Sequence, residues 1–182
     1  EALRELWTPI YGPVGGLKIA TTTKVMQVLM GIDHPCGGAI YSKRIHASPA
    51  TIRLADHMHV VMECELAVRV GKTFEPRGTP YTRDEVRAAI SEVMPAFELI
   101  EDRNADYKST KAYSLIADNA WNAGIVLGGR PVRPMDVDLR WVGALLFKNG
   151  VIEETGLAAG VLNHPARSEE HTSELQSRRV IS

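Results

Sequence analysis

Apolar positions that alternate or run together predict most of the β-strands of this chain. The clearest case is residues 59–70 (HVVMECELAVRV), where both alternating sets contain apolar residues, so we expect a strand covered on both faces. Asn149-Gly150 is the dipeptide most typical of a two-residue hairpin turn, and apolar segments flank it on both sides. The other expected strands are residues 96–101, 124–127, 139–147 and 151–154.

Apolar residues at helical spacing predict short helices between these strands. Thr23 is the expected N-cap of a helix over residues 24–30. Residues 82–85 (TRDE) form a capping box, followed by an apolar face that extends to Met94, and Pro95 is expected to end that helix. Further short helices are expected at residues 1–6 and 114–123, and Gly- and Pro-rich loops at residues 9–16 and 33–38.

The mixed order of many strands and short helices predicts a β-rich α+β domain. The 182 residues carry 21 Lys+Arg against 22 Asp+Glu, a formal net charge of −1, and 45% are hydrophobic. This balance argues against nucleic acid or an acidic membrane surface as the main partner. The apolar runs are too short to cross a bilayer, and two cysteines, Cys36 and Cys64, cannot form a disulfide framework. A reducing cytoplasm is therefore the expected location.

The last part of the chain, residues 167–182, differs in composition from the rest. It is polar and has no useful period, and its first eleven residues (RSEEHTSELQS) resemble the translation of a common sequencing adapter. We therefore expect a non-native, disordered tail and exclude it from the reasoning about the fold. Because the chain also starts inside a helical pattern without an initiator Met, residues 1–166 are expected to be an incomplete domain.

Three glutamates are the strongest candidates for chemistry. Glu63 and Glu65 are two positions apart on the expected strand, so they leave the same face with Cα atoms about 6.5–7 Å apart. Glu98 lies on the next strand and faces away from Phe97 and Leu99. Two like charges ~5 Å apart repel by about 3 kcal/mol at an effective dielectric of ~20, so such a cluster must hold protons or a cation. An all-oxygen set favours Mg²⁺ or Mn²⁺, although a Glu-x-Glu pair is more often simply a solvated face.

Five segments also occur together in a specific order. They are residues 16–26 (GLKIATTTKVM), 63–71 (ECELAVRVG), 94–103 (MPAFELIEDR), 115–129 (LIADNAWNAGIVLGG) and 149–165 (NGVIEETGLAAGVLNHP). Together they resemble the 2-keto-4-pentenoate hydratase / 2-oxohepta-4-ene-1,7-dioate hydratase group of the fumarylacetoacetate hydrolase superfamily. The resemblance implies a mixed β roll with flanking helices, a bound Mg²⁺ or Mn²⁺, and an incomplete catalytic domain over residues 1–166.

The resemblance also implies roles for individual residues. Glu63, Glu65 and Glu98 match the metal ligands of the family. Lys18 matches an active-site lysine of the family. The sequence leaves two roles open for it. Lys18 either moves protons, with a pKa that burial lowers, or forms a structural ion pair with the carboxylates. Many relatives carry an aspartate at the position that aligns near Cys36. Asp33 is expected to take the role of that aspartate here, unless this role is absent.

Two residues complete the candidate site as substrate contacts, Leu66 and Asn119. For Asn119 and for Asn122 the alternative is that the side chain satisfies backbone groups near a helix. The histidines lack the spacing of metal ligands, so we expect them to be surface or hydrogen-bonded structural residues.

The predicted function is a metal-dependent hydratase that adds water to a 2-hydroxy-2,4-dienoate in aromatic-compound degradation. The alternatives are decarboxylation of a 2-oxo-3-hexenedioate, hydrolysis of an acylpyruvate, and an inactive partner subunit or fragment. All three enzymes need a cation that stabilises an enolate, so the sequence discriminates poorly among them. The expected partners are a small 2-oxo or 2-hydroxy acid, further copies of the chain, and a partner decarboxylase.

Overall fold

The structure is a computed structural model that describes residues 2–160 and 180–181. The predicted α+β class is confirmed, with short helices around mixed β-sheets. The helices are α1 (Ala2–Tyr11), α2 (Lys24–Met30), α3 (Arg83–Ala89) and α4 (Ala112–Ala117). The strands are β1 (Val14–Ala20), β2 (Cys36–Tyr41), β3 (Ile45–Ala47), β4 (Val60–Val70), β5 (Ile90–Glu101), β6 (Asn122–Leu127), β7 (Gly143–Lys148), β8 (Val151–Leu157) and β9 (Val180–Ile181). Short 3-10 turns are η1 (Ser42–Arg44), η2 (Leu54–Asp56), η3 (Asn119–Trp121), η4 (Leu139–Trp141) and η5 (Ala158–Gly160).

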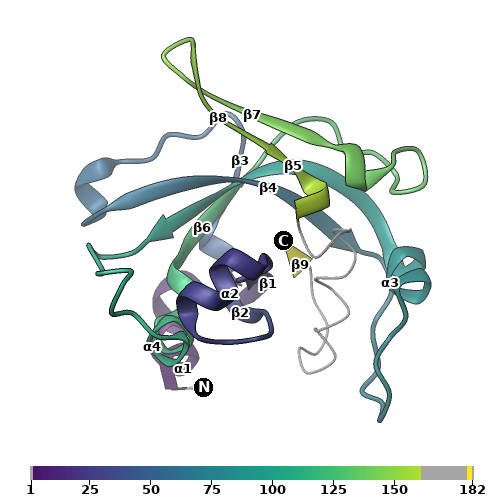
Figure 1. The fold of residues 1–182 in the computed structure, drawn as a ribbon, viewed down its shortest axis with the longest axis horizontal. Coiled ribbons are helices and arrows are strands. Elements are labelled where there is room, and N and C mark those ends of the chain that lie inside the picture. Colours follow the sequence, from purple (N-terminus) through teal and green to yellow (C-terminus); the bar gives the residue numbers. More distant parts are fainter. Residues whose placement is uncertain (1, 161–179, 182) are drawn as a thin grey trace.

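One curved sheet organises the molecule. Its strand order is β2-β1-β9-β4-β5-β6-β3, and β7 and β8 form a separate hairpin. The pairs β1–β9 and β3–β6 are parallel and the others antiparallel, so the sheet is mixed. Figure 1 shows β4 and β5 as a long curved pair, with α2 on the concave side and the β7–β8 hairpin on the other side. The concave side of the long pair therefore faces α2.

Clusters of buried core residues lie on both faces of the sheet. One cluster of buried residues joins β2, β4, β5 and β6, namely Ile40, Ala67, Met94, Ala96 and Ile125. The expectation that both faces of β4 are covered is wrong for part of the strand, because Val61 and Met62 are 37% and 52% exposed.

Local signals in the sequence give several helix ends and one turn correctly. The Thr23 hydroxyl accepts a hydrogen bond from the Met26 amide at the start of α2, and the Thr82–Glu85 capping box is complete at the start of α3. Asn149 and Gly150 have φ values of 52° and 82°, as a type I′ hairpin turn requires, and the predicted β7–β8 hairpin is confirmed.

The predicted extension of α3 to Met94 is wrong. The helix ends at Ala89, and β5 begins at Ile90 and contains Pro95. The strand tolerates this proline because of the side to which its backbone groups point. The Pro95 carbonyl accepts a hydrogen bond from the Gly128 amide at 3.0 Å, just past the end of β6. The amide position of Pro95 faces the same side as its carbonyl, away from β4. The missing N–H of Pro95 therefore costs no ladder hydrogen bond with β4.

Three other boundaries also differ from the predictions. The expected loop over residues 9–16 is shorter, since α1 continues to Tyr11 and β1 begins at Val14. The expected loop over residues 33–38 ends where β2 begins, at Cys36. The segment before β7 is the 3-10 turn η4, in which the Asp138 side chain accepts from the Arg140 amide. In each case pairing or capping within a few residues overrides the composition of the segment.

Most of the expected tail lies outside the described residues. Val180–Ile181 forms β9, between β1 and β4, which differs from the expectation of disorder at these two positions. The non-native origin of residues 167–182 stays a prediction. No helix within the described ranges is both long and apolar enough to cross a membrane.

Candidate metal centre

Three carboxylates meet on the concave face of the β4–β5 pair. Glu63 lies directly opposite Glu98 in the antiparallel register, and Glu65 lies opposite Ala96, two positions further on. Because opposite residues share a face of the sheet, the three side chains point to one side. One oxygen of each carboxylate lies within 4.8 Å of the others. Glu98 is buried, Glu65 half-buried and Glu63 exposed, so the cluster opens toward solvent at Glu63.

Lys18 reaches this cluster from strand β1 of the same sheet. Its Nζ lies 3.0 Å from Glu98 Oε2 and donates to the Ala120 carbonyl at 3.2 Å, and the residue is 5% exposed. Gly38 on β2 makes room for this approach. A Cβ at Gly38 would lie 2.5 Å from the Asn119 carbonyl oxygen and 3.2 Å from Lys18 Cγ. The glycine therefore lets η3 and the lysine pack against β2.

Asn122 fixes the second oxygen of Glu98. Its Nδ2 donates to Glu98 Oε1 at 2.7 Å, and Asn122 is 5% exposed. A register shift between Leu99 and Ile100 brings Asn122 opposite Ile100 at the start of β6. Both oxygens of the most buried carboxylate are thus held in place by named donors, which orients Glu98 toward the other two acids.

The charges of the cluster shift the protonation of its members. Burial, followed by the charges of Glu98 and Glu63, raises the pKa of Glu65 to about 8. Burial acts to lower the pKa of the Lys18 ammonium, but Glu98, Glu63 and Glu65 outweigh it and hold that pKa above its usual value. The expectation that burial lowers the Lys18 pKa is therefore wrong.

The cluster fits a hard divalent cation. Like charges at this distance repel in a half-buried site, and a divalent ion compensates for them without adding a proton. The donors that converge are carboxylate oxygens, with no His or Cys among the three, which suits Mg²⁺ or Mn²⁺ better than zinc.

Three other residues predicted for the site lie differently. The Asp33 side chain is 95% exposed beside His34, and it is not one of the three acids that come together. Leu66 packs on a core cluster that includes Leu17 and Val68, on the opposite face of β4 from Glu65. Asn119 is buried, and its side chain accepts from the Ala39 amide at 2.6 Å and donates to the Ala39 carbonyl at 2.8 Å.

The Asn119 side chain thus satisfies backbone groups of β2, which is the alternative that the sequence leaves open. Its backbone has a φ of 55°, in the left-handed region that asparagine tolerates better than most residues. The structure therefore brings together Lys18, Glu63, Glu65 and Glu98, and adds Asn122 as the residue that holds Glu98.

A second group of polar residues near the end of β5 was missed by the sequence analysis. Asp102 is 3% exposed and accepts from the His59 ring at 2.7 Å, the Tyr107 hydroxyl at 2.9 Å and the Asn104 amide at 2.9 Å. The side chain of Glu101 accepts from the His57 ring and from the backbone amides of residues 58 and 59. The two histidines were predicted to be surface or hydrogen-bonded structural residues, and these contacts agree with that.

These contacts make a prediction about acid stability. Burial opposes ionisation of Asp102, but the hydrogen bonds from His59, Tyr107 and Asn104 outweigh it and hold the pKa of this carboxyl below its usual value. Because the pKa of Asp102 is lower in the folded protein than in the unfolded chain, the ionised carboxylate stabilises the fold. This stabilisation is present above about pH 4, the pKa of an aspartate in the unfolded chain, and is lost as the pH falls through the pKa of Asp102 in the folded protein.

We therefore expect Asp102→Asn to lower the free energy of unfolding by about 1–3 kcal/mol at pH 7 and to flatten its decline as the pH falls below about 4. Urea unfolding at a series of pH values measures both effects. Asp136→Asn, in an exposed ion pair with Arg133, is the matched control and should follow the wild-type curve. An Asp102→Asn protein with the wild-type pH dependence would refute the assignment.

Comparisons with known proteins find relatives among hydratases. The chain is 44% identical over 156 residues to a 2-oxo-hept-4-ene-1,7-dioate hydratase of Escherichia coli, covering 83% of this chain and 58% of that protein. It is 32% identical over 151 residues to a 2-hydroxypent-2,4-dienoate hydratase of Pseudomonas putida, covering 82% of this chain and 67% of that protein. No family model matches the chain.

A solved structure is similar over almost the whole chain. It is a 4-oxalocrotonate decarboxylase from Pseudomonas putida G7, complexed with magnesium and adipate. The TM-score is 0.89 at 26% identity, and the match covers 98% of this chain and 70% of that one. The chain spans less than two thirds of the length of the first of these relatives, the hydratase of Escherichia coli.

Proposed function

The chain belongs to the 2-keto-4-pentenoate hydratase / 2-oxohepta-4-ene-1,7-dioate hydratase group of the fumarylacetoacetate hydrolase superfamily, and we propose that its protein is a divalent-metal-dependent hydratase. The proposed reaction adds water to a 2-hydroxy-2,4-dienoate and gives a 4-hydroxy-2-oxo acid. The observation that carries the proposal is the convergence of Glu63, Glu65 and Glu98 within 4.8 Å, with Lys18 against Glu98.

In this proposal Glu63, Glu65 and Glu98 hold Mg²⁺ or Mn²⁺. When bound, such an ion supplies Lewis acidity to the carboxylate and C2 oxygens of a 2-oxo or 2-hydroxy acid. The exposure of Glu63 and the burial of Glu98 support an approach of the substrate from the Glu63 side. Asn122 keeps the Glu98 carboxylate in one orientation, and a preorganised ligand lowers the cost of reorganisation on binding.

Lys18 is the proposed proton-transfer residue. Hydration of the dienol first requires a proton at the far carbon, which gives the conjugated ketone, and water then adds at C4. The Lys18 ammonium is held by Glu98 and by the Ala120 carbonyl, so it stays protonated and oriented at the edge of the cluster. A positioned acid or base typically accelerates such a proton transfer by about 10²–10⁴-fold. Asp33, Leu66 and Asn119 keep no role in this proposal.

A decarboxylase of a 2-oxo-3-hexenedioate is the second candidate. The similarity to a 4-oxalocrotonate decarboxylase at a TM-score of 0.89 favours it, and decarboxylation needs the same stabilisation of an enolate at C2. The hydratase is preferred because the relative with 44% identity is named as a hydratase.

We also propose that copies of the chain assemble. Helix α2 carries apolar residues that are largely exposed, with Val25 at 77% and Val28 at 79%, and Trp141 is 69% exposed elsewhere. Exposed apolar groups of this kind are typical of surfaces that another protein covers. A complex with a decarboxylase, which the sequence analysis also expected, stays a prediction.

The assay that tests the function follows the ultraviolet absorbance of 2-hydroxy-2,4-pentadienoate in the presence of the purified protein. We expect Mg²⁺-dependent loss of the dienol absorbance without release of CO₂, and its suppression by a chelator. With 2-oxo-3-hexenedioate, stoichiometric release of CO₂ would favour the decarboxylase instead. Failure to consume any of these acids with Mg²⁺ or Mn²⁺ present would overturn the proposed function.

A further inference from the structure

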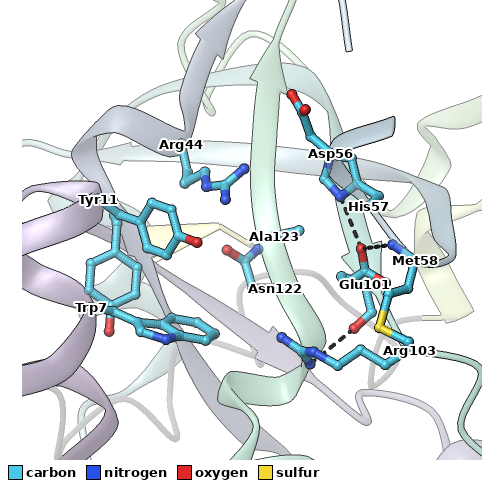
Figure 2. Close-up of a pocket in the computed structure, with 11 residues that line it drawn as sticks. Trp7, Tyr11, Arg44, Asp56, His57, Met58, Glu101, Arg103, Asn122 and Ala123 are labelled. Atoms are coloured by element: carbon cyan, nitrogen blue, oxygen red, sulfur yellow. Dashed lines mark hydrogen bonds and ion pairs between the residues drawn. The ribbon is translucent and has the colours of Figure 1, made fainter. Parts of the chain in front are cut away.

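A separate cavity of about 200 Å³ lies between α1 and the start of β6. Figure 2 shows Trp7 and Tyr11 on one side of it, Arg44 above, Asn122 at the centre, and Glu101 and His57 on the far side. The cluster residues Lys18, Glu63, Glu65 and Glu98 do not line it. The cavity is smaller than the ~300–1,000 Å³ typical of sites for drug-sized ligands, so its occupant must be small.

A cation and an aromatic wall set the chemistry of the occupant. The Arg44 guanidinium lies 4.2 Å from the centre of the Tyr11 ring and has no carboxylate partner in the part of the chain that the structure describes. Trp7 meets Tyr11 and Tyr41 edge-on, with ring centres 5.7 Å and 5.8 Å apart. A stacked, unpaired arginine beside aromatic rings suits a planar group that carries a carboxylate.

The acidic residues at the cavity do not cancel this preference. Glu101 accepts hydrogen bonds from the His57 ring and from two backbone amides, so its carboxylate is held by its own donors on the opposite side of the cavity from Trp7 and Tyr11. Arg103 pairs with Asp118, which lies outside the lining. Asp56 is exposed to solvent at the rim, where water screens its charge. Arg44 thus remains the unpaired charge that faces the aromatic wall.

We propose that this cavity is a second small-molecule site, for a small planar carboxylic acid. The carboxylate of the ligand binds the Arg44 guanidinium, and its planar group packs against the aromatic wall of Trp7 and Tyr11. This proposal does not rest on the proposed reaction.

The test uses 4-hydroxybenzoate as the probe and the full 182-residue chain without added metal. Calorimetry should give saturable binding, and 4-hydroxybenzamide, which has nearly the same shape but no charge, should bind at least about tenfold more weakly. In ¹⁵N NMR spectra the indole N–H signal of Trp7 should shift, while that of the exposed Trp141 stays in place.

Variants locate the site. Arg44→Gln should weaken binding by about tenfold or more, whereas Arg130→Gln, at an exposed arginine outside the cavity, should leave it unchanged. Glu63→Gln should also leave it unchanged, which separates this cavity from the carboxylate cluster. Arg44→Lys keeps the charge and serves if Arg44→Gln fails to fold. Equal binding of the amide, loss of binding in Glu63→Gln, or no saturable binding at millimolar concentration would overturn the proposal.

Discussion

Replacing Glu63 or Glu65 by glutamine is expected to abolish Mg²⁺-dependent turnover while leaving the protein folded. Each change removes one of the three carboxylates that converge within 4.8 Å, and a neutral amide oxygen is a much weaker ligand for a hard cation. Since changes to residues that only orient a ligand already cost about 10–100-fold in affinity or activity, we expect a loss of more than about 100-fold. Steady-state assays on the dienoate measure it.

Glu65→Gln, which is expected to abolish turnover, should stabilise the folded protein when no metal is added. Burial and the neighbouring charges raise the pKa of Glu65 to about 8, so this carboxylate is held in an unfavourable place. Glu65→Gln should therefore raise the free energy of unfolding of the metal-free protein by about 1–2 kcal/mol, and should remove the stabilisation that Mg²⁺ gives. Glu153→Gln, on the exposed strand β8, is the matched control and should change neither quantity. Retained turnover in Glu63→Gln or Glu65→Gln would end the metal hypothesis.

Replacing Lys18 by methionine is expected to cost both stability and turnover. The substitution leaves the buried Glu98 carboxylate without its cation, and breaking a buried pair from one side typically costs about 3–5 kcal/mol. Turnover should fall by about 10²–10⁴-fold if the lysine transfers a proton. Thermal or urea unfolding and single-turnover kinetics measure the two effects separately. Lys72→Met, at an exposed position in the loop after β4, is the matched control.

A double variant distinguishes the two roles of Lys18. In Lys18→Met with Glu98→Gln both buried charges are gone, so most of the lost stability should return. Turnover should not return, because the proton donor and one ligand are both missing. A Lys18→Met protein as stable as the wild type would contradict the structural pair. Near wild-type turnover in Lys18→Met would contradict the proton-transfer role.

The faces of the site strands were predictable from the sequence. Alternation along residues 59–70 and 96–101 puts Glu63 and Glu65 on one face and separates Glu98 from Phe97, and the observed register places Glu63 opposite Glu98. The period of a strand is two, so each of these orientations depends only on near neighbours. The capping box at Thr82 and the Asn149-Gly150 turn were predictable for the same reason.

Features that depend on distant partners were not predictable. The helix expected through Met94 is a strand from Ile90, because pairing with β4 and β6 overrides helical spacing. Asn119 holds the backbone of Ala39, eighty positions away, and Asn122 holds Glu98. The sequence marks both asparagines as candidates but does not distinguish their roles.

The charge balance around Lys18 shows the same limit. Burial predicts a lowered pKa, and only the positions of three carboxylates from two other strands reverse the direction. The exposed Asp33 was chosen by its place near Cys36 in the sequence, and the fold carries it away from the acids. Near neighbours therefore give the faces of strands, whereas the electrostatics of a site need the tertiary fold.

The most direct test is crystallographic. Crystals of the protein soaked with Mn²⁺ should show one anomalous difference peak within bonding distance of carboxylate oxygens from Glu63, Glu65 and Glu98, with the Lys18 ammonium still beside Glu98. A peak elsewhere on the molecule, or a well-ordered metal that any of these three acids does not contact, would contradict the assignment of this cluster as the centre of the chemistry.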